Sequence, residues 1–217
     1  EFALPTNWEI ARVEIGGKKA AWRVTAGSVF GPVLLSWTDS AANDVASLAS
    51  SVNRVVGEET GANGIPVATS WDLDVQPSGT FSVVESTILV ADQWSRANAI
   101  TEAGDITGIL SDGATGHDVD WPDTAFVIRD ASLELLPAGK RNRYSVGRDL
   151  NDADIVGAIG LVSGPSSPRN AARWNSRNKL EDLTSHFGES WSYTQASGIN
   201  SQGDIVGFGS IVDNGPP

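Results

Sequence analysis

An internal repeat of about fifty residues is the feature that most constrains how this chain can fold. Four segments share an apolar stretch, a polar turn and a β-branched strand that carries a glycine. They are Ala46–Glu59, Ala97–Leu110, Gly147–Gly160 and Ala196–Gly209, and their shared glycines are Gly57, Gly108, Gly157 and Gly207. The first, second and fourth segments align from their leading alanine to this glycine without a gap, and the third is one residue shorter at the turn. Four copies in phase indicate an array of similar units.

Each segment has the residue pattern of a β-hairpin. The turn carries Gly104, Gly203 or Asn53 at the aligned place, and these residue types tolerate a positive φ. β-branched residues follow the turn in every copy, which favours a strand. The pattern therefore predicts a strand, a tight turn and a strand in each segment.

A second signature precedes each hairpin by about thirty residues. It pairs a small residue with a large apolar one at Ala20–Trp22, Ala68–Trp71, Ala125–Ile128 and Ala171–Trp174. A further strand-like stretch lies between each signature and the next hairpin, so each unit holds about four short strands. Residues 38–52 show the nearest approach to a helical pattern, but their alignment with the repeat argues against a helix.

These observations predict an all-β, β-propeller-like fold with four to five blades in a single domain spanning residues 1–217. The expected units lie near residues 18–60, 65–110, 123–160 and 169–209. Terminal strands at 7–15 and 210–217 could close the ring by pairing in one blade, or could form part of a fifth blade. A four-stranded sheet buries both faces only by stacking on neighbours, which is the physical reason for a radial array.

The net charge and the absence of cysteine exclude several kinds of binding partner and of site chemistry. The chain has 15 Lys and Arg against 27 Asp and Glu, which gives a net charge of −12. Such a field repels phosphate backbones, so we expect no nucleic-acid partner, and no apolar stretch is long enough to predict membrane insertion. Without cysteine there is no disulfide, thiol nucleophile or cysteine metal site.

The combined pattern A-x-x-I-N-x-x-G-x-I-V-G, alternating with A-x-x-W, resembles the HAF-type extracellular repeat family. The name of that family refers to a His-Ala-Phe signature, and this chain has Thr124, Ala125 and Phe126 at that place. The resemblance covers residues 20–209. It implies an exported bacterial repeat protein, extracellular and propeller-like. It implies no single activity and supplies no catalytic residues.

The stretch at residues 111–124 is the most unusual insertion because it breaks the repeat. Asp118, Asp120 and Asp123 offer hard oxygen ligands there, which Ca²⁺ could use, and no other cofactor is expected. The alternative is a solvated turn, since Asp, Gly and Pro also build turns. Trp121 lies off the repeat pattern and could be an exposed platform for a ligand.

The distribution of tryptophan suggests a carbohydrate site. Trp22, Trp71 and Trp174 occupy the repeat signature, which favours core packing. Trp94 and Trp191 instead lie just upstream of hairpins, where an indole could stack on a sugar ring.

The residues beside these two tryptophans extend the expected site. Trp191, Tyr193 and Gln195 alternate along an expected strand, so we predict that they share one face. Together with Trp94 and Arg96 of an earlier repeat, they could form a recurring pocket between blades. The competing interpretation is a second layer of packing between blades.

Signals for catalysis are weak. The two histidines, His117 and His186, have no Gly-x-Ser-x-Gly context, and Ser176–Lys179 matches Ser-x-x-Lys without its partner motifs. Paired carboxylates could act as glycosidase acids, and the pairs are Glu58–Glu59, Asp72 with Asp74, Asp152 with Asp154, and Glu181–Asp182. The basic run Gly139–Arg148 could contact an acidic polysaccharide or form a solvated hairpin tip.

The leading functional prediction is an extracellular, lectin-like module that binds a carbohydrate or polysaccharide. The first alternative is a secreted hydrolase or lyase that acts on polysaccharide or ester bonds with carboxylates at one end of the channel. The second alternative is a structural scaffold with no small ligand.

Overall fold

The protein is all-β in the computed structural model, and its sheets are antiparallel. The structure describes residues 8–9, 12–15, 18–21, 24–25, 40–47, 53–61, 63–75, 81–91, 93–111, 123–140, 142–161, 169–187 and 191–211. The all-β prediction is confirmed. Within these ranges the structure contains no helix with the length and apolar character needed to span a membrane.

In the described part of the chain, three four-stranded sheets form the main body, and each is a meander in which consecutive strands pair. The first contains β5 (Ser40–Ser47), β6 (Asn53–Thr60), β7 (Pro66–Val75) and β8 (Phe81–Ile88). The second contains β9 (Trp94–Ile100), β10 (Ile106–Ser111), β11 (Asp123–Arg129) and β12 (Ser132–Leu135). The third contains β13 (Tyr144–Leu150), β14 (Asp154–Gly160), β15 (Arg169–Asn175) and β16 (Leu180–Asp182).

Smaller sheets stand at both ends of the described chain. At the C-terminal end, the one-turn 3₁₀ helix η1 (Leu183–His186) precedes a two-stranded sheet of β17 (Trp191–Ile199) and β18 (Ile205–Ile211). Near the N-terminus, β1 (Trp8–Glu9) pairs with β4 (Val24–Thr25), and β2 (Arg12–Ile15) pairs with β3 (Lys18–Ala21). These two pairs share one continuous register, because Trp8 faces Thr25 and Ile15 faces Lys18.

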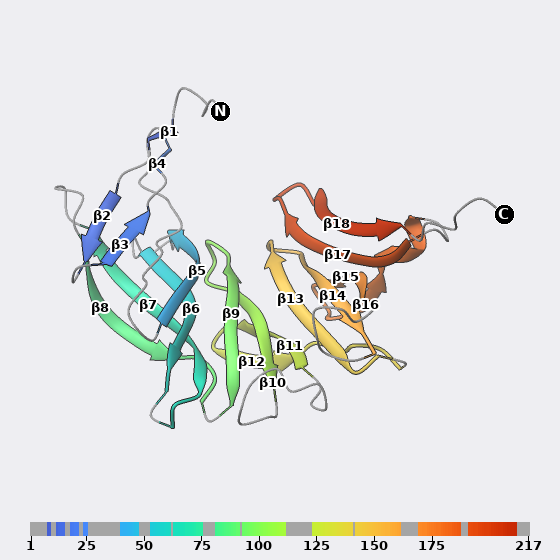
Figure 1. Cartoon of the computed structure of the whole chain (residues 1–217), viewed down its shortest axis with the longest axis horizontal. Helices are drawn as coiled ribbons and strands as arrows, with labels where there is room; N and C mark the ends of the chain where they lie inside the picture. The colour runs from blue at the N-terminus through green and yellow to red at the C-terminus, as the bar shows by residue number, and fades with distance from the viewer. Residues whose placement is uncertain are drawn as a thin grey trace.

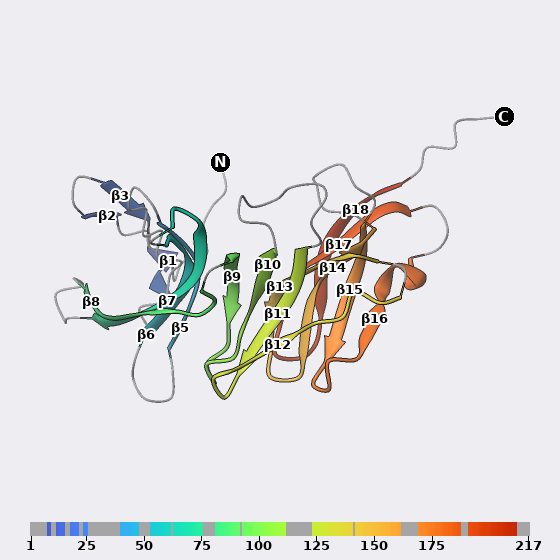
Figure 2. The same ribbon diagram turned by 90° about the horizontal axis from the view of Figure 1, so that it is seen from below.

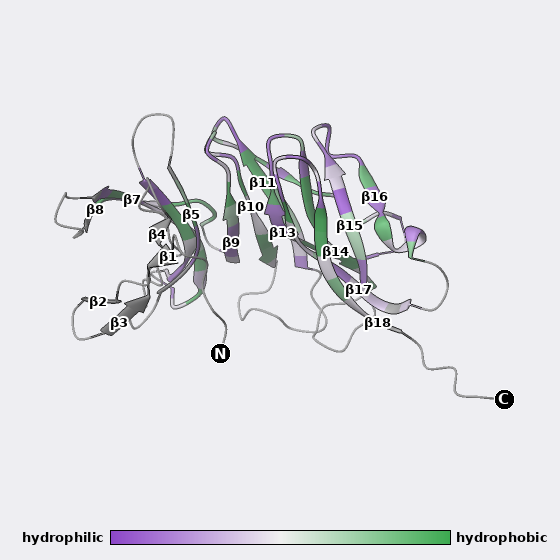
Figure 3. Ribbon diagram, turned by 90° about the horizontal axis from the view of Figure 1, so that it is seen from above, coloured by the Kyte–Doolittle hydropathy of each residue, from purple (hydrophilic) through white to green (hydrophobic). Residues whose placement is uncertain are grey.

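The sheets follow one another side by side in chain order (Figures 1 and 2). The first strands of successive sheets adjoin, since β5 contacts β9, β9 contacts β13 and β13 contacts β17. Figure 3 shows hydrophobic residues along the strands of the second and third sheets and hydrophilic residues at the turns that join them. The interior is therefore the space between neighbouring sheets.

The sheets and the sequence repeat are out of phase by two strands. The unit expected at residues 65–110 supplies β7 and β8 to the first sheet and β9 and β10 to the second. The reason is that a periodic sequence has no intrinsic starting point. Because β10 pairs with β11, strands of two successive sequence units belong to one sheet. The repeat by itself does not mark where one sheet ends and the next begins.

The repeated glycine has a steric cause. In each first strand one extra residue is bulged out of the ladder, and the glycine of the second strand pairs with the residue just before this bulge. A Cβ on Gly157 would collide with the carbonyl oxygen of Val146, and a Cβ on Gly108 with that of Arg96. Only glycine lets the two backbones approach so closely.

The expected alignment of the first hairpin was wrong by several residues. Gly57 pairs with Ala42, whereas Ala46 pairs with Arg54. Asn53 lies inside β6 and not in the turn, because the ladder of β5 and β6 continues two residue pairs further beyond the bulge than the ladder of β9 and β10. Gly104 and Gly203 do occupy turns, with φ values of 92° and 87°.

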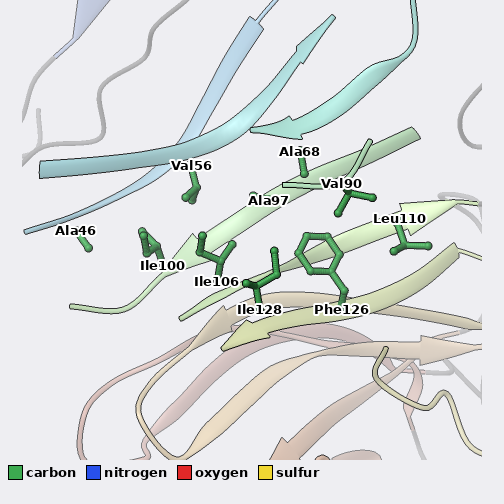
Figure 4. Packing of buried hydrophobic residues seen from close by; sticks show 10 residues of the cluster. All are labelled: Ala46, Val56, Ala68, Val90, Ala97, Ile100, Ile106, Leu110, Phe126 and Ile128. Carbon is green, nitrogen blue, oxygen red and sulfur yellow. The ribbon is translucent and has the colours of Figure 1, made fainter. Parts of the chain in front are cut away.

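Apolar side chains fill the spaces between sheets. Figure 4 shows the cluster between the first and second sheets, which contains Ala46, Val56, Ala68, Val90, Ala97, Ile100, Ile106, Leu110, Phe126 and Ile128. A second cluster, between the second and third sheets, includes the fully buried Trp174. Trp71 is also buried, so the predicted core role is confirmed for both tryptophans. Trp22 lies outside the described residues.

A hydroxyl hydrogen bond joins each sheet to the next. The N–H of Ala68 donates to Ser95 Oγ (2.8 Å), and that of Ala171 donates to Thr194 Oγ1 (2.8 Å). Both alanines belong to the repeat signature and lie in third strands, while both hydroxyls lie in the first strand of the following sheet. This bond fixes which residues of the first strands are equivalent.

Candidate functional site

The hydroxyl hydrogen bond between sheets shows which expected ligand residues of β9 and β17 occupy equivalent positions. Tyr193 precedes Thr194 as Trp94 precedes Ser95, so Tyr193, and not Trp191, is the counterpart of Trp94. The sequence had suggested that Trp94 and Trp191 correspond. Trp94 and Tyr193 pair with residues that lie at the same distance after the shared glycine, namely Ser111 and Ser210, whereas Trp191 pairs with Ile211.

Trp94 is a core residue of the described structure. Only 7% of its surface is exposed, and it packs with Ile109, Tyr144 and Val146 between the second and third sheets. The guanidinium carbon of Arg96 lies 6.0 Å from the centre of the Trp94 ring. Trp94 therefore supports the position of Arg96 and does not offer an open stacking face.

Trp191 and Gln195 do come together, at a cavity of about 340 Å³ beside the β17–β18 hairpin. The aromatic rings of Trp191 and Phe187 are tilted by 52° with their centres 5.8 Å apart. The cavity is lined by Ala171, Leu183, His186, Phe187, Trp191, Thr194, Gln195, Ala196, Ile205, Val206, Gly207, Phe208 and Gly209. Its wall is thus mainly apolar with a few polar groups.

The cavity lies beside a hairpin that has no third strand among the described residues. Val206 is 66% exposed on β18, whereas Val156 at the same position of β14 is completely buried. Gly209 also contributes, because a Cβ there would contact the six-membered ring of Trp191. Backbone without a side chain leaves room for the indole.

Tyr193 lies next to this cavity and is connected to it through Gln195. Its hydroxyl donates a hydrogen bond to Gln195 Oε1 (3.2 Å), and its ring stacks on Phe208 with centres 5.9 Å apart. Gln195 itself is 7% exposed. The amide of Gln195 is therefore held in place by the phenol before any ligand arrives.

A contact between a histidine and a carboxylate lies beside the cavity. His186 Nε2 lies 3.2 Å from Glu181 Oε1, and Arg173 contacts the other carboxylate oxygen at 2.5 Å. The hydrogen bonds from His186 and then Arg173 hold the pKa of Glu181 below its ordinary value. Glu181 is thus an ionised acceptor near His186, which lines the cavity.

Arg96 on β9 and Arg169 at the start of β15 both act electrostatically on Arg148 of β13, and we name these three residues the arginine cluster. The guanidinium carbon of Arg169 lies 4.6 Å above the Tyr144 ring. Burial lowers the pKa of Arg148, and the like charges of Arg96 and Arg169 act in the same direction. Burial also raises the pKa of the Tyr144 phenol.

The residues expected to bind calcium are only partly described. Asp118, Asp120 and Trp121 lie outside the described residues, as does His117. Asp123 is completely buried at the start of β11, facing Ser111 in the ladder. Among the described residues there is no group of three acidic or histidine side chains placed to hold a metal ion.

Several of the paired carboxylates are engaged in ion pairs. Asp72 accepts from Arg54 at 2.6 Å, and Asp154 lies 3.7 Å from Arg173. Asp182 accepts the N–H of Thr184 and caps η1. These contacts give the carboxylates structural roles between and within strands.

Sequence reasoning missed Tyr144 and Arg169 as members of the site. The repeat could have indicated Tyr144. Tyr144 stands two residues before Val146, as Trp94 stands two residues before Arg96, so Tyr144 occupies the place of Trp94 in its own repeat. Arg148 was noticed only as the end of a basic run.

Comparison with known proteins found no matching family model, no matching curated protein and no matching solved structure.

Proposed function

We propose that this chain is a lectin-like, carbohydrate-binding module whose sugar site is the cavity beside Trp191. The observation that carries the proposal is that Trp191 and Gln195, two residues expected to bind a sugar, line the same cavity. Its volume of about 340 Å³ suits one or two sugar rings, given that small-molecule sites span roughly 300–1,000 Å³.

The lining offers both kinds of contact that a sugar ring requires. The indole of Trp191 and the phenyl of Phe187 present apolar faces for C–H groups. Gln195 and Thr194 offer amide and hydroxyl groups for the ring hydroxyls. Because the Tyr193 hydroxyl already orients Gln195, less ordering is required on binding, which favours affinity.

We propose that the sheets are the blades of a propeller and that the chain is an extracellular member of the HAF-type repeats. Support comes from the meander pairing within each sheet and from the contacts between successive first strands. The repeated hydroxyl bond between neighbouring sheets is a further support, since it spaces them equally. In this arrangement the first strands line the central channel.

Isothermal titration with cello-, chito- and xylo-oligosaccharides tests the binding proposal. We expect Trp191→Ala and Gln195→Ala to weaken the binding of one of these series at least tenfold, with little change in melting temperature. Leu135→Ala is the matched control, because Leu135 is 56% exposed in another sheet. Equal binding by all three variants, or no binding of any series by the wild-type chain, would overturn the proposal.

The second candidate is a hydrolase or lyase, and Glu181 at 3.2 Å from His186 is the observation that favours it. A carboxylate of lowered pKa can act as a base but not as an acid at neutral pH. Release of new sugar ends in the same titrations, abolished in Glu181→Gln, would establish this activity. Absence of new ends would leave the module as a binder.

A further inference from the structure

Arg148 is a partly buried cation with a buried atom that has no partner. Its Nε atom is buried without a hydrogen-bond partner, and none of the ion pairs of the described residues includes it. Other arginines of this acidic chain are paired, for example Arg54 with Asp72 and Arg129 with Asp105. Burying an unpaired guanidinium costs free energy, so a fold that keeps one has reason to use it.

Arg148 occupies a position at which two other strands have an asparagine that bonds to the next sheet. It is the bulged residue of β13, and the bulged residues of β5 and β9 are Asn43 and Asn98. Asn43 donates to the carbonyl of Ala97 (2.7 Å), and Asn98 donates to that of Gly147 (2.6 Å). Each asparagine thus joins its sheet to the next sheet. Arg148 gives up this bond and places a cation there instead.

The neighbouring groups add positive charge and donors around Arg148. Arg96 is held by Asn98 Oδ1, which accepts from its Nε at 3.0 Å and leaves the terminal nitrogens of the guanidinium for other partners. Arg148 feels the charges of both Arg96 and Arg169. The phenols of Tyr144 and Tyr193 also lie within its electrostatic reach, and Asp123 lies within that of Tyr144.

We infer that the arginine cluster is an oxyanion site that takes the carboxylate of an acidic sugar. An anion placed there would satisfy Arg148 and relieve the repulsion among the three guanidinium groups, and arginine matches carboxylates in two-point contacts. The choice of a sugar as the carrier of the carboxylate rests on the proposed function. Tyr193 connects the two sites, because it contacts Gln195 at the cavity and is electrostatically coupled to Arg148.

Titration with tetragalacturonate and with its carboxyl-reduced, neutral counterpart tests this inference. We expect the wild-type chain to bind the acid at least tenfold more tightly than the neutral tetrasaccharide. Arg148→Gln should abolish this preference and leave the neutral affinity unchanged. Arg143→Gln is the matched control, since Arg143 is exposed just before β13 and carries the same charge. Should Arg148→Gln fail to fold, Arg148→Lys keeps the charge but loses the two-point geometry, and Arg96→Gln removes a second donor.

Inorganic sulfate, measured through the melting temperature, separates the two proposals. If the acid and neutral tetrasaccharides bind equally well, the oxyanion site is overturned and carbohydrate binding stands. If neither binds but sulfate stabilises the wild-type chain and not Arg148→Gln, the oxyanion site stands and a sugar is overturned as its ligand. If neither sugar binds and sulfate has no effect, both proposals are overturned.

Discussion

The side-chain oxygen of Ser145 accepts a hydrogen bond of 2.9 Å from the backbone N–H of Ala125, which lies in the preceding sheet. The same bond joins Ser95 to Ala68 and Thr194 to Ala171. It explains why the alanine signature and the hairpin recur with one period: the two motifs are the halves of a single junction between sheets.

Removing the Ser145 hydroxyl should destabilise the fold. Ser145→Ala leaves the buried N–H of Ala125 without an acceptor, which costs about 1–3 kcal/mol in the free energy of unfolding. Urea unfolding followed by tryptophan fluorescence measures this loss. The control is Ser132→Ala, since Ser132 is exposed in β12. Equal stability of the two variants would contradict the role given to the junction.

Substitution of Gly157 should be more harmful than substitution of a loop glycine. A Cβ on Gly157 meets the carbonyl oxygen of Val146, so Gly157→Ala must separate two paired strands and should cost about 1–3 kcal/mol or more. Gly64 has a φ of 79° and open space around it, so Gly64→Ala costs only the left-handed strain of about 1–2 kcal/mol. The melting temperatures of the two variants show which substitution destabilises the protein more. A larger loss for Gly64→Ala would refute the steric explanation of the repeat.

Trp94 and Trp191 should respond differently to truncation. Trp94→Ala opens a cavity between two sheets and should lower the free energy of unfolding by about 3–5 kcal/mol. Trp191 is only half-buried, so Trp191→Ala should cost less and affect ligand binding directly. Denaturation curves for both variants test this order, and a Trp94→Ala protein of wild-type stability would show that the packing described here is incorrect.

Asp44 should make the protein less stable as the pH rises. Burial raises the pKa of this carboxyl, although Ile100 N–H donates to it at 2.9 Å. Because the folded pKa exceeds the unfolded value of about 3.9, the folded state prefers the protonated form. Stability is therefore lost as the pH rises from about 4 through the folded pKa.

Asp44→Asn removes this charge and keeps an oxygen that can accept from Ile100. The variant should thus gain stability relative to the wild type as the pH increases from 3 to 7. Urea midpoints across that range measure the difference, with Asp152→Asn as the control because Asp152 lies in an exposed turn. A difference that stays constant or shrinks toward neutral pH would show that Asp44 is not a buried, strained carboxylate.

Much of the local structure could be predicted from the residues. The turn glycines Gly104 and Gly203 and the buried Trp71 and Trp174 follow from backbone sterics and hydrophobic periodicity, which act within a few residues. The first hairpin was misaligned because two additional residue pairs between β5 and β6 leave the pattern of alternating residues unchanged while they move the turn.

The candidate site was predicted in part. Trp191, Tyr193 and Gln195 do meet near one cavity, whereas Trp94 is part of the core. A tryptophan that packs between sheets and one that faces a cavity have the same appearance in a sequence, since the difference depends on what the neighbouring sheet places opposite. Arg148 and Arg169 were missed for the same reason, because they are far apart in the chain and approach only through the pairing of β13 with β14 and of β14 with β15.

The sequence by itself determined the all-β character, the period and the repeated glycine opposite each bulged strand, because each of these depends on contacts along one strand or across one turn. The tertiary structure decided where each sheet begins and which aromatic rings are buried. It also decided which arginines lie together. These properties depend on contacts between residues of different sheets, such as that of Asp149 with Ile199 (2.8 Å), and a local pattern carries no information about them.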